Sequence, residues 1–386
     1  MNSVAIRMLV GDRAKFIGII VGLTFAALLM TQQMSIFVGL MTRTFGFIND
    51  TSYPDVWVMD PKVQQIDDLK PMQDTQLYRV RGVEGVEWAM PIYKGLLRAR
   101  LPDGTFQTCN VVGLDDATLI GGPPEMIEGS LADLRRAESV IVDIVGAEGK
   151  LAKPPTEPGG RPVPLRVGDT LELNDHRAVV VGICRVSRTF QSQPVVYTTY
   201  SRATRFAPRE RKLLTFIVAK GKEGIAPEEL CQRITAATRL AAYTGPAFKW
   251  VTVRYFLKNT GIPINFGIST MLGLIVGTVI AGQTFYNFTL DNLKQFGALK
   301  AMGASNLLLL RMILLQAFGV GFIGYGIGVG AASLFGSSAG RTELAFRLLP
   351  ETLGIVAGAI GLICILSAVI SMWKVLTLEP AIVFKG

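Results

Sequence analysis

The placement of apolar residues along the chain is the strongest constraint on its fold. One hydrophobic run begins near Lys15, about two hundred residues of mixed composition follow, and three more runs lie between about Pro263 and Trp373. A run of about 20 apolar residues crosses the hydrocarbon core of a bilayer as a helix. The sequence therefore predicts a membrane α-helical bundle of four transmembrane helices, with a large mixed α/β extracytoplasmic domain between the first and second helices.

Composition agrees with a membrane protein. Hydrophobic residues make up 49% of the chain and charged residues only 18%, below the roughly 25% of soluble domains. The net charge of +9 first suggests nucleic acid. The basic residues are scattered, however, and many stand beside the ends of the predicted spans. We therefore expect membrane lipids as partners and no nucleic acid.

The flanking charges predict the orientation of the first span. Arg7, Arg13 and Lys15 precede its apolar run, and basic residues favour the cytoplasmic side. The run continues to about Ile48, so residues 15–48 are longer than a bilayer requires at about 1.5 Å per residue. We interpret them as transmembrane helix 1 continued by a stalk under the domain formed by residues 49–258.

The remaining spans are predicted at residues 259–288, 306–337 and 351–373, joined by residues 289–305 on the cytoplasmic side and by a short outer loop at 338–350. Four spans return the tail, residues 374–386, to the cytoplasm. Lys294, Lys300 and Arg311 support this orientation, whereas Arg341 and Arg347 in the outer loop oppose it. We predict a multi-pass membrane protein with both termini in the cytoplasm.

Small residues recur at helical spacing in all four spans. Such stripes allow close approach of helix backbones where lipid offers no hydrophobic drive. They predict tight packing, within the chain or against a second copy. The glycines concerned are Gly18, Gly22, Gly273, Gly277, Gly324, Gly328, Gly354 and Gly358.

Ionisable residues are absent from the middle of every predicted span. Proton-coupled transporters and ion channels usually place such residues there. An ion-driven carrier is therefore not favoured, and any transport would need an external source of energy.

The extracytoplasmic domain shows two hairpin signals. Asp103-Gly104 separates strand-like residues 95–101 from 106–112, and Asn174-Asp175 separates 170–173 from 178–183. Short turns of this composition between alternating runs are typical of β-hairpins. Further strands are predicted at 56–59, 139–144, 194–199 and 214–219, a helix at 226–240, and a break between lobes near Pro154.

Catalytic and metal-binding signals are weak, and we predict no catalytic, cofactor-binding or metal-binding residues. The only histidine, His176, falls in a predicted turn. The G-x-S-x-G pattern at 336–340 follows an apolar span rather than a strand, contrary to what a nucleophile elbow requires. The phosphate-binding loop motif of ATPases is also missing. Among Cys109, Cys184 and Cys231, a bridge from Cys109 to Cys184 is the most plausible pairing, with reduced thiols as the alternative.

The segment at 289–305 carries the most specific pattern. It predicts a short helix with Leu293, Phe296 and Leu299 on one side and Gly303 as its C-terminal cap. Residues 295–304, QFGALKAMGA, resemble the coupling-helix motif E-I-G-x-L-K-A-L-G-A of the MacB/FtsX-like permeases of ABC transporters, with Gln295 in place of the acidic residue. Without this resemblance, the segment would be read as an interfacial connector.

The resemblance covers the whole chain. The order of one span, a large outer domain and three spans is that of the MacB/FtsX-like permease fold, and Leu378-Glu379-Pro380-Ala381 resembles the family's C-terminal motif. Residues 1–14 would form the amphipathic cytoplasmic helix that precedes the first span. The DevC-like branch, whose permeases work with an ATPase and a periplasmic adaptor, is the most similar.

The resemblance implies a function. Two permease copies, as a homodimer, would bind a separate ABC ATPase that carries the ATP and Mg²⁺, with a periplasmic adaptor (membrane fusion) protein. ATP hydrolysis would drive export or extraction of a lipid-like or hydrophobic substrate. The implied ATPase-coupling residues are Leu293, Lys294, Phe296, Gly297, Leu299, Lys300 and Gly303.

Two other functions stay open from the sequence. A regulator of the same fold would transmit mechanical force to a periplasmic enzyme, such as a cell-wall hydrolase, and would transport nothing. A membrane-anchored receptor would bind a ligand with its outer domain. Co-purified partners distinguish these cases, because an adaptor indicates export, a hydrolase indicates regulation, and the lack of an ATPase indicates a receptor.

Overall fold

The computed structural model describes residues 2–51, 53–155, 157, 160–208, 214–339 and 344–376. The chain divides into a membrane unit, residues 1–40 with 261–386, and an extracytoplasmic unit, residues 41–260. Part of the predicted outer loop and most of the predicted tail, including residues 378–381, lie outside the described residues.

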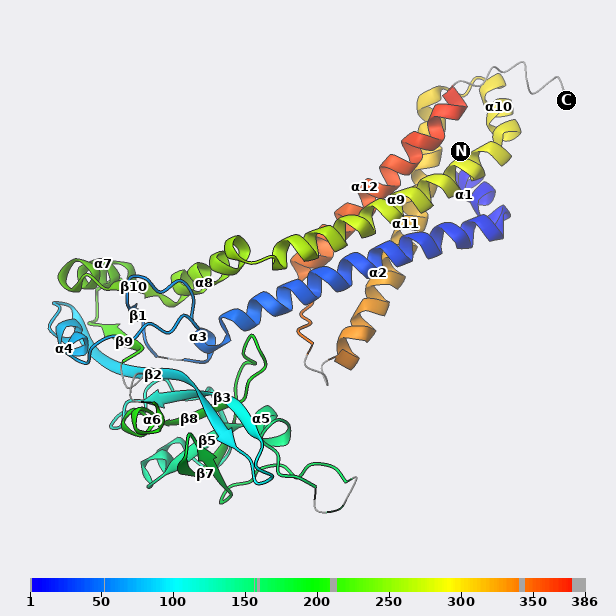
Figure 1. The fold of residues 1–386 in the computed structure, drawn as a ribbon. Helices are drawn as coiled ribbons and strands as arrows, with labels where there is room; N and C mark the ends of the chain where they lie inside the picture. Colours follow the sequence, from blue (N-terminus) through cyan, green and yellow to red (C-terminus); the bar gives the residue numbers. More distant parts are fainter. Residues whose placement is uncertain are drawn as a thin grey trace. The chain divides into compact units, whose positions relative to one another are not determined.

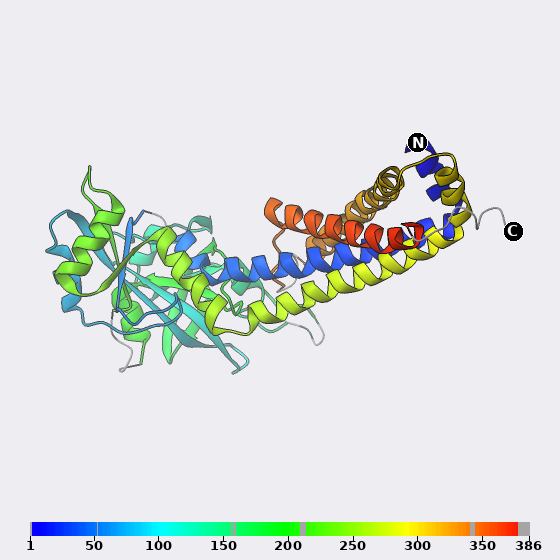
Figure 2. The same cartoon turned by 90° about the horizontal axis from the view of Figure 1, so that it is seen from above.

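The membrane unit is helical. Four of its helices are long and apolar enough to cross a membrane, which confirms the predicted four-span bundle. In both views α9 and α12 run side by side and α2 lies along α9 (Figures 1 and 2). The helices are α1 (Asn2–Gly11), α2 (Arg13–Thr44), α9 (Ile262–Asp291), α10 (Leu293–Ala301), α11 (Asn306–Ala339) and α12 (Pro350–Leu376).

Large apolar side chains point outward from the spans. Phe322, for example, is 79% exposed, and Ile268 and Val369 are also exposed. Contiguous apolar surface of this kind is rare on soluble proteins and suits contact with lipid. The interior of the unit is a single buried cluster that includes Leu23, Phe285 and Ile363.

The first membrane helix ends earlier than predicted. Helix α2 stops at Thr44, and the chain turns at Phe45 before the short helix α3 (Gly46–Asp50). The turn places Phe45, Phe47 and Ile48 against one core of the outer domain. Burial of these apolar side chains explains why the predicted helix and stalk over residues 15–48 are interrupted after Thr44.

The extracytoplasmic unit is built on a ten-stranded sheet in the order β10-β1-β9-β2-β3-β8-β5-β7-β4, with β6 beside β2 and β7. Most pairs are antiparallel, and β3–β8 and β5–β7 are parallel. The strands are β1 (Val56–Met59), β2 (Val86–Arg100), β3 (Phe106–Leu114), β4 (Glu125–Glu128), β5 (Ser139–Asp143), β6 (Thr170–Leu173), β7 (His176–Arg185), β8 (Val195–Thr199), β9 (Phe216–Gly221) and β10 (Ala241–Thr244).

Both predicted hairpins are confirmed. Strands β2 and β3 pair from Tyr93–Gly113 to Arg100–Phe106, and Gly104 takes the positive φ of 84° that the turn needs. Strands β6 and β7 pair around Asn174 and Asp175, which also have positive φ. Asparagine, aspartate and glycine tolerate this conformation better than other residues.

Helices cover the sheet in this unit (Figure 1). The predicted helix over 226–240 is present as α7. Sequence reasoning missed strands β4 and β10, the first half of β2, and the other helices, all of which are short or lack a clear period. The helices are α4 (Thr75–Arg81), α5 (Ile144–Glu148), α6 (Tyr200–Phe206), α7 (Pro227–Thr238) and α8 (Gly245–Asn259), with a 3₁₀ turn at Leu131–Arg135.

The sheet is buried on both faces. Along β3, Cys109 and Val111 belong to one buried cluster, and Val112 and Leu114 belong to another. Successive side chains of a strand point to opposite faces, so each face has its own core. The residues around Pro154 do not separate two lobes, because one sheet runs through the unit.

The bridge considered between Cys109 and Cys184 is not formed. Both cysteines are free and buried, and they belong to the clusters on opposite faces of the sheet. Burial raises the pKa of the Cys109 thiol to about 12 and that of Cys231 to about 11. These cysteines therefore behave as small apolar core residues with little reactivity.

Candidate functional site

The segment between the second and third membrane helices folds as a short capped helix, α10. Its C-terminal end forms a Schellman motif, in which Ala304 N–H donates to Leu299 O and Gly303 N–H donates to Lys300 O. Gly303 has the positive φ of 96° that this cap needs. Glycine adopts this conformation at little cost, which explains why the helix ends here.

Phe296 lies inside the membrane unit. It is fully buried, in the same cluster as Phe288 of α9, Met312 of α11 and Met372 of α12. Gly297 is also buried, and Leu299 packs against the cluster. Phe296 therefore fixes α10 to the bundle. This finding changes the interpretation of Phe296, because a fully buried ring cannot also belong to the surface that contacts a partner, as the sequence suggested.

A different face of α10 is exposed. Lys294, Ala298 and Met302 follow one another at intervals of four residues and are all exposed, Met302 by 75%. Residues four apart share one side of a helix. We call these three residues the exposed stripe of α10. Sequence reasoning did not select Ala298 or Met302, because nothing in the pattern showed which side the bundle covers.

Charged and polar contacts tie neighbouring helices to this end of the bundle. Lys15 of α2 forms an ion pair with Asp291, the last residue of α9. Lys15 also pairs with Asp12 at 3.0 Å, and its hydrogen bond holds the pKa of the Asp12 carboxyl below its ordinary value. Gln316 of α11 donates to the Ala5 carbonyl of α1 at 2.7 Å. Helices α1, α2, α9 and α11 thus meet near α10.

The predicted glycines of the second and third spans lie against α2. A Cβ on Gly277 would come within 2.6 Å of Ala26 Cβ, and one on Gly328 within 2.6 Å of Ala27 Cβ. Gly273, Gly324 and Gly22 are similarly close to a facing helix, whereas a Cβ on Gly18 would only reach Thr284 at 4.0 Å. Around Gly354 and Gly358, no other described residue comes within 4 Å of the added Cβ position.

An apolar groove of about 420 Å³ lies between α2, α9 and α12. Met30, Met34 and Phe37 of α2 line one side, and Phe266 of α9 and Ile355 of α12 line the other. These α2 residues belong to the part of the helix that leads into the outer domain. The groove can hold apolar chains and offers few polar partners.

The residues with a superficial catalytic pattern serve structural roles. His176 begins β7, and its ring stacks on Phe206 with a centroid distance of 5.6 Å. Ser338, the central serine of the G-x-S-x-G pattern, lies in α11 and donates to the Phe335 carbonyl at 2.7 Å. A helix precedes it rather than a strand, so it is not a nucleophile elbow. In the described part of the chain, three or more potential metal ligands do not cluster anywhere.

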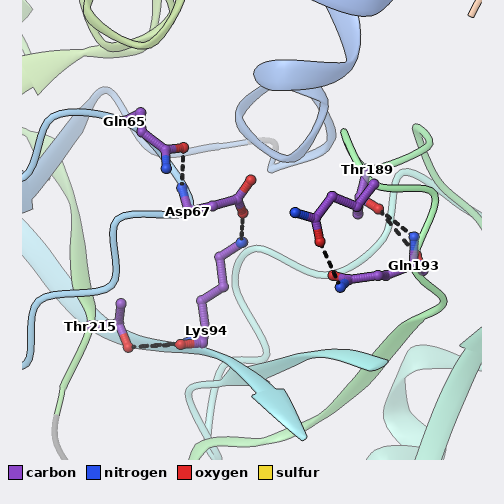
Figure 3. Close-up of polar contacts among 7 residues, drawn as sticks. Gln65, Asp67, Lys94, Thr189, Gln193 and Thr215 are labelled. Carbon is purple, nitrogen blue, oxygen red and sulfur yellow. Dashed lines mark hydrogen bonds and ion pairs between the residues drawn. The ribbon is translucent and has the colours of Figure 1, made fainter. Parts of the chain in front are cut away.

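A polar cavity in the extracytoplasmic unit was not predicted. Lys94, Asp67 and Asn110 converge on it from β2, the segment after β1, and β3 (Figure 3 shows Lys94 and Asp67). Polar residues at inward positions of otherwise apolar strands are the signal that could have revealed it.

Comparison with known proteins identifies the domains. Residues 16–237 match the MacB-like periplasmic core domain, and residues 266–380 match the FtsX-like permease C-terminal domain. An uncharacterized ABC transporter permease, from two strains of Mycobacterium tuberculosis, is 26% identical over 321 residues, which are 82% of this chain and 80% of the relative.

Solved structures show weaker likeness. The extracellular domain of the noncanonic ABC-type transporter YknZ from Gram-positive bacteria has a TM-score of 0.35 and 8% identity, and covers 50% of this chain and all of that one (100%). The periplasmic region of MacB from Actinobacillus actinomycetemcomitans has a TM-score of 0.35 and 12% identity, with 55% and 95% covered. These scores are too low to support an argument.

The two domain matches and the four-span architecture define a class, the transport subunits that are embedded in a membrane. Within this class, the chain belongs to the MacB/FtsX-like permeases of ABC transporters.

Proposed function

We propose that this permease couples ATP hydrolysis by a separate ABC ATPase to export or extraction of a lipid-like or hydrophobic substrate. Two copies act together, with a periplasmic adaptor protein. ATP and Mg²⁺ bind the ATPase and not this chain. The observation that carries the proposal is α10, which is fixed to the bundle by Phe296 and presents its exposed stripe on the opposite side.

The proposed orientation follows from the same helix. The ATPase works in the cytoplasm, so α10 and both chain termini face the cytoplasm of a bacterial inner membrane. Arg7, Arg13 and Lys294 would then stand on this side, in agreement with the preference of basic residues for the cytoplasmic side. The domain of residues 41–260 then lies outside.

The buried side of α10 explains how motion would enter the bundle. ATP-driven closure of the ATPase would displace the exposed stripe. Phe296 shares a close-packed cluster with residues of α9, α11 and α12, and packed interiors transmit displacement because they have little free volume. Leu293, Lys300 and Gly303 support the shape of α10 in this proposal.

The apolar groove supports a hydrophobic substrate. It is lined by the C-terminal part of α2 and the N-terminal parts of α9 and α12. These parts form the outer half of the bundle in the proposed orientation. The spans lack ionisable residues at their centres. A lipid-like molecule could enter the groove from the outer leaflet without a polar path across the bilayer.

Replacement of Met302 by alanine tests the ATPase contact. Burial of a methionine side chain in a partner typically contributes about 1.5–3 kcal/mol, and 1.4 kcal/mol is about tenfold in affinity. We expect Met302→Ala to weaken ATPase association about tenfold and to leave the thermal stability of the permease unchanged. ATPase recovered with the permease from detergent extracts is the measurement.

Two further variants sharpen this test. Ala298→Glu adds bulk and charge to the stripe and should weaken association without loss of stability. Phe296→Ala should instead lower permease stability by about 3–5 kcal/mol, as buried aromatic truncations do. Full ATPase recovery with both stripe variants would show that α10 is only a connector.

A further inference from the structure

A polar cavity of about 350 Å³ lies within the extracytoplasmic unit, outside the coupling region. Its walls come from β2, β3, the segment after β1, the loop between β7 and β8, and the end of α8. Figure 3 shows Lys94 and Asp67 on one side of this space, and Thr189 and Gln193 on the other. None of the site residues predicted from the sequence lines this cavity.

Lys94 is held at the inner wall. Its side chain is 2% exposed and pairs with Asp67, which is partly exposed. The ammonium also stands over the Phe47 ring, 5.8 Å from its centroid. The ammonium has three N–H donors, and Asp67 is its ion-pair partner. Lys94 can therefore donate further hydrogen bonds toward a molecule in the cavity.

Asn110 supplies a matching acceptor. It is 4% exposed, and its Oδ1 atom has no hydrogen-bond partner in the part of the chain that the structure describes. Asn110 pairs with Leu96 across β2 and β3, two positions from Lys94, so both polar side chains belong to the same face of the sheet. A buried oxygen without a donor costs about 1–3 kcal/mol, and a ligand N–H would remove that cost.

The other walls are apolar or neutral and are held in place. Phe190 and Phe256 pack with ring centroids 4.8 Å apart. The loop that carries Phe190 is fixed by Ser187, whose N–H and O–H both donate to Asp50, and by Gln193 N–H, which donates to Thr189 Oγ1 at 2.8 Å. A preformed wall reduces the ordering cost of binding.

We infer that this cavity binds a small uncharged ligand that carries an amide group, such as a short apolar peptide segment. The amide carbonyl accepts from Lys94, its N–H donates to Asn110 Oδ1, and an apolar substituent packs on Phe190 and Phe256. One lysine and one aspartate line the cavity and pair with each other, so its formal charge is zero and a charged ligand would meet no unpaired counter-ion. The inference does not depend on the proposed transport function.

The test measures binding of three matched probes to the full-length protein in lipid nanodiscs by saturation-transfer NMR and calorimetry. The probes are N-acetyl-leucine amide, which is neutral, N-acetyl-leucine, which is anionic, and leucine amide, which is cationic. We expect the neutral probe to bind at least tenfold more tightly than either charged one. Glucose serves as a neutral probe that has hydroxyl groups but no amide.

Asn110→Leu separates a ligand role from a structural one. Leucine has similar size and removes the unpaired oxygen, so the variant should melt at the same or a higher temperature and bind the neutral probe at least tenfold more weakly. Lys94→Met should also bind the neutral probe more weakly. It serves as the second test if Asn110→Leu folds poorly. Gln107→Leu, on the same strand and outside the cavity lining, is the matched control and should bind normally.

Several results would overturn the inference. These are absence of binding by the neutral probe, equal binding of the charged probes, unchanged binding in both Asn110→Leu and Lys94→Met, or binding of glucose in preference to the amide.

Discussion

At the scale of single residues, burial decides what a side chain can do in this permease. Phe296 belongs to a motif that resembles a partner-binding helix, yet it is fully buried. Asp50 is also buried and is kept as an acceptor for two donors of Ser187, at 2.7 and 2.8 Å. A buried carboxyl group of this kind makes the stability of the protein depend on pH.

Asp50→Asn tests that dependence. Burial raises the pKa of the folded carboxyl above its ordinary value of 3.8. Its contribution to stability is therefore fully present below the unfolded pKa and is lost as pH rises through the folded pKa. Asparagine keeps an acceptor for Ser187 and does not ionise. We expect the melting temperature of wild type minus that of the variant to fall between pH 4 and pH 7.

Thermal unfolding of the full chain, followed by circular dichroism across this pH range, is the measurement. Asp103→Asn is the control, since Asp103 is exposed and its pKa is lowered by hydrogen bonds to Thr105. Its contribution to stability is lost only as pH falls below about 3.8, so its difference from wild type should stay nearly constant between pH 4 and pH 7. A constant difference for Asp50→Asn would show that burial does not perturb this carboxyl.

At the scale of helices, α2 is the element around which the membrane unit packs. Glycines of α9 and α11 bring both helices against its backbone, with Gly277 facing Ala26 and Gly328 facing Ala27. Close approach of this kind gains dispersion contacts that replace the missing hydrophobic drive in lipid. Gly354 and Gly358 of α12 have no such neighbour among the residues that the structure describes, and their predicted packing role would require a second copy.

Gly328→Ala tests this packing. A methyl group there would lie 2.6 Å from Ala27 Cβ and 2.7 Å from the Thr24 carbonyl oxygen. We expect the helices to separate, at a cost of about 1–3 kcal/mol typical of overpacking. Gly330→Ala is the control on the same helix, because nothing lies within 4 Å, and it should be neutral or slightly stabilising. Thermal stability in detergent compares the two. Equal stability would mean that α2 and α11 pack loosely.

At the scale of the whole molecule, two connections join the membrane unit to the extracytoplasmic unit, and they differ. The first boundary, between Leu40 and Met41, falls inside the continuous helix α2. The second, between Thr260 and Gly261, falls between α8 and α9. A continuous helix can transmit torque, whereas an interrupted one transmits less. We therefore propose that, if the permease works as proposed, α2 transmits force between the two units more directly than α9 does.

A flexible glycine insertion after Met41 tests this assignment. We expect the variant to bind its ATPase and hydrolyse ATP while transport activity in cells is lost. The same insertion after Gly261, where the helix is already interrupted, should cost much less activity. If both insertions reduce activity equally, α2 has no special mechanical role.

Orientation is tested by cysteine labelling with a reagent that cannot cross the membrane. The four native cysteines are buried, so background labelling should be low. A cysteine introduced at the exposed Glu223 should react from outside intact cells, and one at the exposed Gln295 should not. The reverse pattern would place α10 outside and would exclude an ATPase contact.

The sequence by itself determined the four spans, the inserted α/β domain, both hairpins and the position of the short helix α10. These features depend on local signals, such as the length of apolar runs, turn residues like Asp103-Gly104, and a glycine that can adopt positive φ at position 303. Each feature depends on residues that are close to one another in the sequence, so one sequence is enough to predict it.

Only the tertiary structure decided which side of each element is covered. The burial of Phe296, the exposed stripe of α10, the separation of Cys109 from Cys184 by the sheet and the meeting of Lys94, Asp67 and Asn110 all depend on contacts between distant segments. Hydrophobic periodicity gives a helix or strand an apolar side but does not say which partner covers it. That choice is made by the packing of the whole chain, because it depends on the volume and shape of side chains far apart in sequence.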